Sequence, residues 1–299
     1  MAEPSVTILG LGLMGTAIAD AYLAAGYRVV VWNRSAAKAD DLVTRGAVRA
    51  STMTDAITSG PLVIAPLLDC AATQAVLEQA GTDLSGRLLV NLANGTPEQA
   101  RQLAASAAAH GADYLDGAMM ALPQTVATPA AFFLYSGSRN GFTTHRAALE
   151  VMASAHYFGP DPAAAEVHDL AVLGTGYAAL TGFLHAAALL TASAGATPTE
   201  FAPLASQWLR GMADFLPELA REAESRRYAE GVSTIDLNRA SVDALIRIST
   251  GAGVDDSLHG PLQTLLTRRS AAGHGSDSFS SIFELLRPQH DSTTNSGRP

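Results

Sequence analysis

Residues 6–15 read VTILGLGLMG, and residues 29–38 read VVVWNRSAAK. The first stretch is a β-branched run followed by Gly-x-Gly-x-x-Gly and a helical segment rich in small residues. That order predicts a strand, a tight turn and a helix N-terminus whose backbone N–H groups can bind a pyrophosphate. Gly10 permits the turn, Gly12 lets the diphosphate approach and Gly15 lets the helix pack on the strand. The stretch therefore predicts a dinucleotide-binding domain.

The predicted second strand, residues 27–32, ends where NAD-binding domains carry a carboxylate for the ribose 2′-hydroxyl. This chain has Asn33 and Arg34 there, and Lys38 follows one helical turn later. A carboxylate would repel a 2′-phosphate, whereas a guanidinium and an ammonium attract it. The predicted cofactor is therefore NADPH; the alternative is that Arg34 and Lys38 are solvated surface charges. The predicted cofactor-binding residues are Gly10, Gly12, Leu13, Met14, Gly15, Asn33, Arg34, Ser35, Lys38, Leu67 and Asn94.

Composition limits the partners of the chain. Its 299 residues include 19 basic and 28 acidic side chains, with a formal net charge of −9 and no dense basic run. Nucleic acid is therefore not an expected partner. Cys70 is the single cysteine, and the first residues lack the pattern of a targeting segment, which predicts a cytoplasmic protein. The histidines lack metal-ligand spacing, so no metal site is expected.

Apolar strands alternate with Ala-rich helical stretches as far as residue 160, for example LVIAPLL at 62–68. This alternation predicts an α/β N-terminal Rossmann domain with a doubly wound parallel sheet over residues 1–160. Beyond it the pattern is purely helical. We expect a long interdomain helix at 161–192, an all-α domain for dimerisation and substrate binding at 193–288, and a disordered polar tail at 289–299.

Residues 170–199 contain no Asp, Glu, Lys or Arg and are long enough to span a bilayer. The stretch is rich in Gly and Thr, however, and acidic rather than basic residues flank it, so we do not expect a membrane anchor. A helix that is apolar on all sides is better explained by burial between protein surfaces. Because the helical domain is small for that task, we expect a homodimer.

The lysine count separates two related interpretations. A Rossmann domain that a long helix joins to a helical domain resembles the 6-phosphogluconate and β-hydroxyacid dehydrogenase superfamily. Those enzymes use a lysine in the long helix as acid and base for a hydroxyl. Lys38 is the only lysine of this chain, so the long helix has none. Alcohol oxidation by that route is therefore not expected.

Other motifs resemble the imine reductases and reductive aminases of that superfamily: GLGLMG, WNRSAAK, NLANGT, YLDGAMMALP, FLYSGS and, in the long helix, GFLHA. The resemblance covers nearly the whole chain. It implies NADPH-dependent reduction of C=N bonds, with Tyr177 as the proton donor. It further implies that Asp169 is the base for condensation of an amine with a ketone and that Asn94 positions the substrate. The alternatives are that Tyr177 is a packed core residue and that Asp169 is an ion-paired or solvated carboxylate.

Helical rise separates Asp169 and Tyr177 by two turns, about 12 Å, so they would act at two places along one cleft. Gly174 lies one turn before Tyr177 at a cost of about 1 kcal/mol in helix propensity relative to Ala. That cost suggests close approach of the nicotinamide or of another helix. The expected substrate-pocket residues are Met120, Leu122, Gly174, Trp208, Met212, Phe215, Leu237 and Asn238.

By the resemblance, the last five of these residues come from the partner subunit of a domain-swapped homodimer with a shared active site. The alternative is that they form ordinary helical core. His168 and His185 are expected to be structural. Two other functions stay open: an NADP-dependent β-hydroxyacid-type dehydrogenase, and a non-catalytic NADP-binding regulatory protein.

Overall fold

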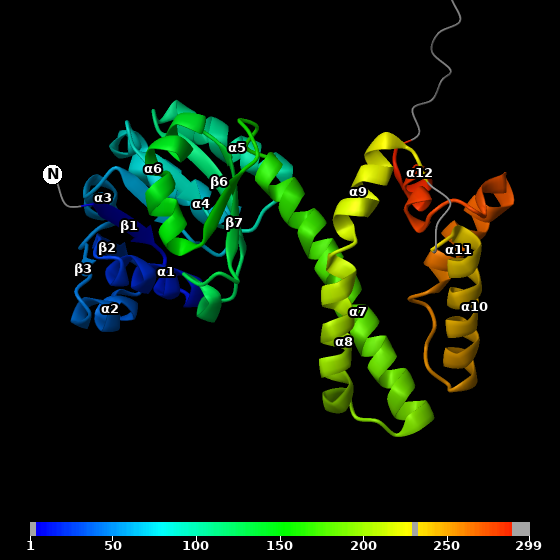
Figure 1. Cartoon of the computed structure of the whole chain (residues 1–299). Coiled ribbons are helices and arrows are strands. Elements are labelled where there is room, and N and C mark those ends of the chain that lie inside the picture. Colours follow the sequence, from blue (N-terminus) through cyan, green and yellow to red (C-terminus); the bar gives the residue numbers. More distant parts are fainter. Residues whose placement is uncertain (1–3, 229–232, 289–299) are drawn as a thin grey trace, which may run out of the picture. The chain divides into compact units, whose positions relative to one another are not determined.

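The computed structural model describes residues 4–228 and 233–288 (Figure 1). It divides into two compact units, residues 1–174 and 175–299, and the division falls within helix α7 (Ala164–Ala194). The expected tail at 289–299 lies outside the described residues. The domain boundaries that the sequence suggests, at residues 160 and 192, remain a prediction.

The first unit contains one eight-stranded sheet with the strand order β3-β2-β1-β4-β5-β6-β7-β8. All neighbouring strands pair in parallel except β6 and β7, which are antiparallel. The strands are β1 (Ser5–Leu9), β2 (Arg28–Trp32), β3 (Val48–Arg49), β4 (Leu62–Ala65), β5 (Leu88–Asn91), β6 (Asp113–Met120), β7 (Phe132–Gly137) and β8 (Ser154–Tyr157).

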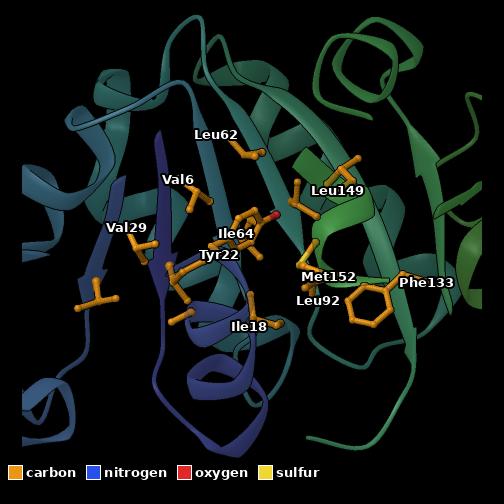
Figure 2. Close-up of a cluster of buried hydrophobic side chains, with 14 of the residues drawn as sticks. Val6, Ile18, Tyr22, Val29, Leu62, Ile64, Leu92, Phe133, Leu149 and Met152 are labelled. Carbon is orange, nitrogen blue, oxygen red and sulfur yellow. The ribbon is translucent and has the colours of Figure 1, made fainter. Parts of the chain in front are cut away.

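Both faces of the sheet are buried. Successive residues of a strand point to opposite faces, so neighbouring residues pack in different clusters. Ile64 and Tyr22, which Figure 2 labels, belong to one hydrophobic cluster that also contains Ile8. Leu9 and Val63 pack in a second cluster. The helices of this unit are α1 (Leu13–Ala24), α2 (Asp40–Thr44), α3 (Met53–Thr58), α4 (Cys70–Ala80), α5 (Pro97–Ala109) and α6 (Arg139–Met152). The predicted Rossmann domain with a doubly wound sheet is confirmed.

The second unit is helical. Its helices after α7 are α8 (Pro198–Ala213), α9 (Leu216–Ser225), α10 (Ile235–Gly251), α11 (Gly260–Arg269) and α12 (Phe283–Leu286). Partly buried polar contacts join its segments: the Arg269 guanidinium donates to Asp277 at 3.0 Å and to Ser281 at 3.2 Å. The predicted all-α C-terminal domain is therefore confirmed.

Helix α7 is long and apolar enough to cross a membrane, and it is the one such helix among residues 4–228 and 233–288. Length and composition alone are weak evidence for a membrane span, since helices packed between protein surfaces share them. Only 6% of its most apolar stretch is buried. Most of this apolar stretch is therefore exposed in the single chain.

Candidate cofactor and active site

The ends of β1, β2, β4 and β5 surround a cavity of about 670 Å³ within the first unit. Carboxyl ends of parallel strands are where doubly wound sheets bind ligands. Ten of the eleven predicted cofactor residues line this cavity, and Ser35 does not. The ten are Gly10, Gly12, Leu13, Met14, Gly15, Asn33, Arg34, Lys38, Leu67 and Asn94.

The glycine loop has the geometry of an anion-binding turn. Gly10 has φ +102°, a conformation that favours glycine, and its N–H donates to the Trp32 carbonyl at 2.9 Å. A Cβ at Gly15 would collide with the Gly10 carbonyl oxygen, whereas a Cβ at Gly12 would meet no atom within 4 Å. Gly12 is also the N-cap of α1 and offers no capping side chain. The first N–H groups of α1 therefore remain for a ligand.

Asn33 joins the glycine loop to the turn that follows β2. Its Oδ1 accepts from the Leu11 N–H at 3.0 Å, and its Nδ2 donates to the Ser35 carbonyl at 3.0 Å. A carboxylate could accept the first hydrogen bond but could not donate the second. Asn33 thus holds the glycine loop and the turn after β2 together, whereas the sequence pattern predicted Asn33 as a direct cofactor contact.

Arg34 and Lys38 lie at the rim of this cavity, beyond the end of β2. Sequence reasoning missed a third basic residue nearby: Arg49, at the end of β3, lines an adjoining cavity of about 300 Å³ together with Asn33 and Arg34. Its guanidinium is 2.5 Å from the Asp40 carboxylate. That ion pair reduces the positive charge that Arg49 offers to a ligand, which leaves Arg34 and Lys38 as the principal cations.

The loop after β5 presents Asn94, whose exposed side chain lines the cavity. The backbone of this loop is held by contacts with Cys70. The Cys70 thiol donates to the Asn94 carbonyl at 3.7 Å, and a Cβ at Gly95 would collide with the Cys70 sulfur. Burial raises the pKa of Cys70 to about 11, so the thiol keeps its proton as a donor.

A buried polar network lies beneath this loop, and sequence reasoning missed it. Asp116 of β6 is fully buried and accepts from the Tyr114 hydroxyl at 2.7 Å and from Asn91 Nδ2 at 3.0 Å. Glu166, in the first turn of α7, is also buried, and its carboxyl interacts electrostatically with that of Asp116. Burial raises the pKa of both carboxyl groups, that of Glu166 to about 8. The sequence signal that could have revealed this network is a polar residue within an apolar strand, such as Asn91 in LLVN.

Helix α7 carries the two side chains expected to do chemistry. Asp169 belongs to the first unit and is 9% exposed, and burial raises its pKa. Tyr177 belongs to the second unit, where its side chain is exposed. The core-tyrosine alternative therefore does not describe Tyr177 in the single chain.

The expected substrate-pocket residues are distributed over both units. Met120 ends β6, and Leu122 is exposed just after it. In the second unit, Trp208 lines an apolar cavity of about 520 Å³ between α7 and α8. Asn238 Nδ2 donates to the Thr234 carbonyl at 2.8 Å in the first turn of α10. The others are Gly174 in α7, half-buried Met212 in α8, and exposed Phe215 and Leu237.

The two histidines of α7 make local contacts. His168 stacks on Phe158, and its Nδ1 is 2.7 Å from the Ala164 carbonyl. His185 Nδ1 is 3.2 Å from Nε2 of His259. Among residues 4–228 and 233–288, no three His, Cys, Asp or Glu side chains are grouped so that they could hold a metal ion.

Comparison with protein families assigns each half of the chain. A model of the NAD binding domain of 6-phosphogluconate dehydrogenase matches residues 5–159. A model of the NADPH-dependent reductive aminase-like C-terminal domain matches residues 161–288.

Individual relatives cover nearly all of the chain. It is 36% identical to an NADPH-dependent reductive aminase of Aspergillus oryzae over 94% of this chain and 97% of that protein. A reductive aminase from Aspergillus terreus, solved with NADPH4, cyclohexanone and allyl amine, superimposes with a TM-score of 0.86 at 39% identity, over 96% of this chain and all of that one. An imine reductase from Bacillus cereus superimposes with a TM-score of 0.82 at 34% identity over the same shares.

Proposed function

The chain belongs to the NADPH-dependent reductive aminase and imine reductase family, and from this premise we propose that it reduces the C=N bonds of cyclic imines, iminium ions and imines formed from a ketone and an amine. The residues of α7 favour C=N reduction over alcohol oxidation. This helix carries a carboxyl at Asp169 and a phenol at Tyr177, and it has no lysine.

NADPH supplies the hydride when it is bound. The residues present fit this cofactor: the α1 N-terminus and the open space at Gly12 suit the diphosphate. Arg34 and Lys38 suit the 2′-phosphate at the rim of the same cavity. Because an iminium carbon readily accepts hydride, the chain mainly has to hold the substrate and exclude water.

Three side chains have proposed roles in the reaction. Asn94, exposed to the cavity, positions the substrate by hydrogen bonding. Burial raises the pKa of Asp169, which makes its carboxylate a stronger base for deprotonating the incoming ammonium. Tyr177 donates a proton to the substrate nitrogen, since a phenol is a neutral donor at neutral pH.

The test is oxidation of NADPH by the purified protein with a preformed cyclic imine, with a ketone plus a near-stoichiometric amine, and with the ketone alone. Turnover of the imine and of the ketone–amine pair supports the proposal. Oxidation of β-hydroxyacids with NADP⁺ would instead indicate a dehydrogenase. Binding of NADPH without turnover of any substrate would indicate a regulatory protein.

Two variants separate the proposed roles. Tyr177→Phe should lower kcat/KM about 100-fold for both the imine and the ketone–amine pair while NADPH affinity is unchanged, because general acids typically contribute 10²–10⁴-fold. Asp169→Asn should lower turnover of the ketone–amine pair and spare the preformed imine. Asp243→Asn, which removes a surface carboxylate paired with Arg247, is the control. Equal losses with both substrates in Asp169→Asn would contradict the role of Asp169 in condensation.

The proposal includes a homodimer with a shared active site. Large apolar side chains of α7, among them Leu170, Leu180 and Leu184, are more than half exposed in the single chain. Trp208 is 66% exposed beside the apolar cavity between α7 and α8. Exposed apolar surface on this scale is typical of a protein interface. A second copy of the chain is the occupant that the proposal assigns to it.

Mixing two inactive variants tests the shared site. If each active site combines Tyr177 of one subunit with Trp208 of the other, a heterodimer of Tyr177→Phe and Trp208→Ala has one site in which both residues are intact. Unfolding and refolding the two variants together should therefore restore roughly a quarter of the wild-type activity, since half of the dimers are mixed. No recovery in a mixture that sedimentation shows to be dimeric would refute a shared site. A monomer in sedimentation would refute the dimer itself.

A further inference from the structure

The loop that presents Asn94 is held by a buried side chain that has no part in the mechanism above. Leu92 and Asn94 line the cofactor cavity, and Ala93 between them is 1% exposed. Asn91, the last residue of β5, hydrogen-bonds to both backbone groups of Ala93. Its Oδ1 accepts from the Ala93 N–H at 3.3 Å, and its Nδ2 donates to the Ala93 carbonyl at 3.4 Å. The two peptide groups that flank Ala93 are therefore attached to one side chain.

Two neighbouring elements hold the Asn91 amide in this orientation. The Thr73 hydroxyl on α4 donates to Asn91 Oδ1 at 2.7 Å, and Asn91 Nδ2 donates to Asp116 Oδ1 on β6 at 3.0 Å. A side-chain amide has two donor and two acceptor sites, and all four are used here. Because the Ala93 N–H can only donate, it must face the oxygen of the amide, so the network specifies which way the amide points.

The fold brings these partners to one place. Asn91 and Asp116 lie opposite each other in the parallel register of β5 and β6, so their side chains lie on the same face of the sheet. On α4, Thr73 follows Cys70 by one turn, and Cys70 donates to the Asn94 carbonyl at 3.7 Å. One face of α4 therefore holds the loop at Asn94 and also holds the amide of Asn91.

Burial makes these hydrogen bonds difficult to replace. Thr73, Asn91 and Asp116 are each 0% exposed, so water cannot take over a hydrogen bond that is lost. A fully satisfied buried network favours one arrangement of the groups that it joins. The backbone at Ala93 is thus held in a single conformation directly before the exposed side chain of Asn94.

We propose that Asn91 is a positioning residue for substrate binding: its amide fixes both backbone groups of Ala93 and thereby directs the side chain of Asn94 into the cavity. Thr73 and Asp116 orient the amide for this purpose. The inference rests on the proposed role of Asn94 in substrate binding. Asn91 acts through Asn94 rather than on the substrate, because its own side chain is fully buried.

Two substitutions weaken the attachment to different degrees. Asn91→Leu removes all four hydrogen bonds, whereas Thr73→Val removes only the hydroxyl that holds the amide and keeps the shape of the side chain. Thr73→Ser retains the hydroxyl and is the conservative variant. Thr7→Val is the matched control. Thr7 in β1 is also 0% exposed, and its hydroxyl donates to the Ala56 carbonyl at 2.8 Å, a hydrogen bond that does not involve the loop.

The first measurement is steady-state kinetics with a preformed cyclic imine at saturating NADPH. Thr73→Val should raise KM about fivefold, the effect of one neutral hydrogen bond, and Asn91→Leu should raise it about tenfold or more. In both variants kcat should change less, because loss of substrate binding appears in KM. Thr73→Ser should keep the wild-type KM. Thr7→Val should lower the Tm about as much as Thr73→Val and leave KM unchanged.

A double-mutant cycle with Asn94→Ala distinguishes positioning from a general loss of packing. If Thr73 acts through Asn94, adding Thr73→Val to Asn94→Ala should raise KM no further. An equal rise of KM in the wild-type and Asn94→Ala backgrounds would overturn the inference. So would a rise of KM in Thr7→Val equal to that in Thr73→Val.

Amide hydrogen exchange of residues 92–97 tests the attachment of the loop without turnover. Exchange should be faster in Asn91→Leu and Thr73→Val than in the wild type, and unchanged in Thr73→Ser and Thr7→Val. Thr73→Val carries the test if Asn91→Leu does not fold. Wild-type exchange in Thr73→Val, or faster exchange with an unchanged KM, would contradict the inference. Absence of turnover with any imine would refute the proposed function alone, and exchange would still decide whether Asn91 holds the loop.

Discussion

Replacement of Arg34 by Ala should remove most of the preference for NADPH over NADH. Arg34 and Lys38 lie at the rim of the cofactor cavity, and neither forms an ion pair with a carboxylate among residues 4–228 and 233–288. By contrast, Arg49 nearby is paired with Asp40. The charge of Arg34 is therefore available to the 2′-phosphate that distinguishes the two cofactors.

The size of the effect follows from the hydrogen bonds lost. A hydrogen bond to a charged group contributes about 1.5–3 kcal/mol, and 1.4 kcal/mol corresponds to a tenfold change in Kd. Arg34→Ala should thus weaken NADPH binding about 10- to 100-fold, and adding Lys38→Ala should weaken it about tenfold more. NADH lacks the phosphate, so its Kd should change less than about twofold.

Fluorescence titration with each cofactor measures both dissociation constants. Arg28→Ala is the matched control, because Arg28 is an exposed arginine at the opposite end of β2, where it contacts the Ser59 carbonyl at 3.4 Å. The wild-type preference should weaken with added salt, and that of Arg34→Ala should respond less. An equal loss of affinity for NADPH and NADH in Arg34→Ala would refute the reasoning. So would a comparable loss of NADPH affinity in the control.

Asn33→Ala should weaken NADPH and NADH alike, by about tenfold in titration, because it detaches the glycine loop from the turn after β2. Tyr22→Phe should lower the free energy of unfolding by about 1 kcal/mol in urea denaturation, since the buried Tyr22 hydroxyl donates to the Ala148 carbonyl at 2.9 Å. Tyr135→Phe should be neutral or stabilising, because the Tyr135 hydroxyl is buried and accepts or donates no hydrogen bond among the described residues. Gly12→Ala should abolish NADPH binding with an unchanged Tm, whereas Gly15→Ala should lower the Tm. Similar losses of stability in the two tyrosine variants, or in the two glycine variants, would contradict these assignments.

The sequence was most informative where a local pattern specifies both a conformation and a ligand. Gly10, Gly12 and Gly15 follow one strand directly, so their spacing predicted the turn, the helix start and the cavity together. The position of Arg34 beside the cavity was equally predictable, because the end of the second strand has a known chemical role in dinucleotide binding.

Contacts between distant segments could not be predicted in this way. Asp116 and Glu166 are fifty positions apart, and their electrostatic interaction depends on how β6 and the start of α7 are placed in three dimensions. The antiparallel pairing of β6 with β7 is similar, since the alternation of apolar residues predicts a strand without its direction. The hydrogen bonds of Asn33 could not be predicted either, because they depend on how the glycine loop and the turn after β2 lie relative to each other.

Lys38 gives this chain an unusual chemical property, because it is the only side-chain amine in 299 residues and lies at the rim of the cofactor cavity. Acylating reagents that label lysines on most proteins at many sites have one side-chain target here. Attachment to an amine-reactive resin through that side chain would obstruct the cavity. Carboxyl-directed coupling to the 28 acidic residues avoids this amine. The same amine offers a labelling site that bound NADPH should protect.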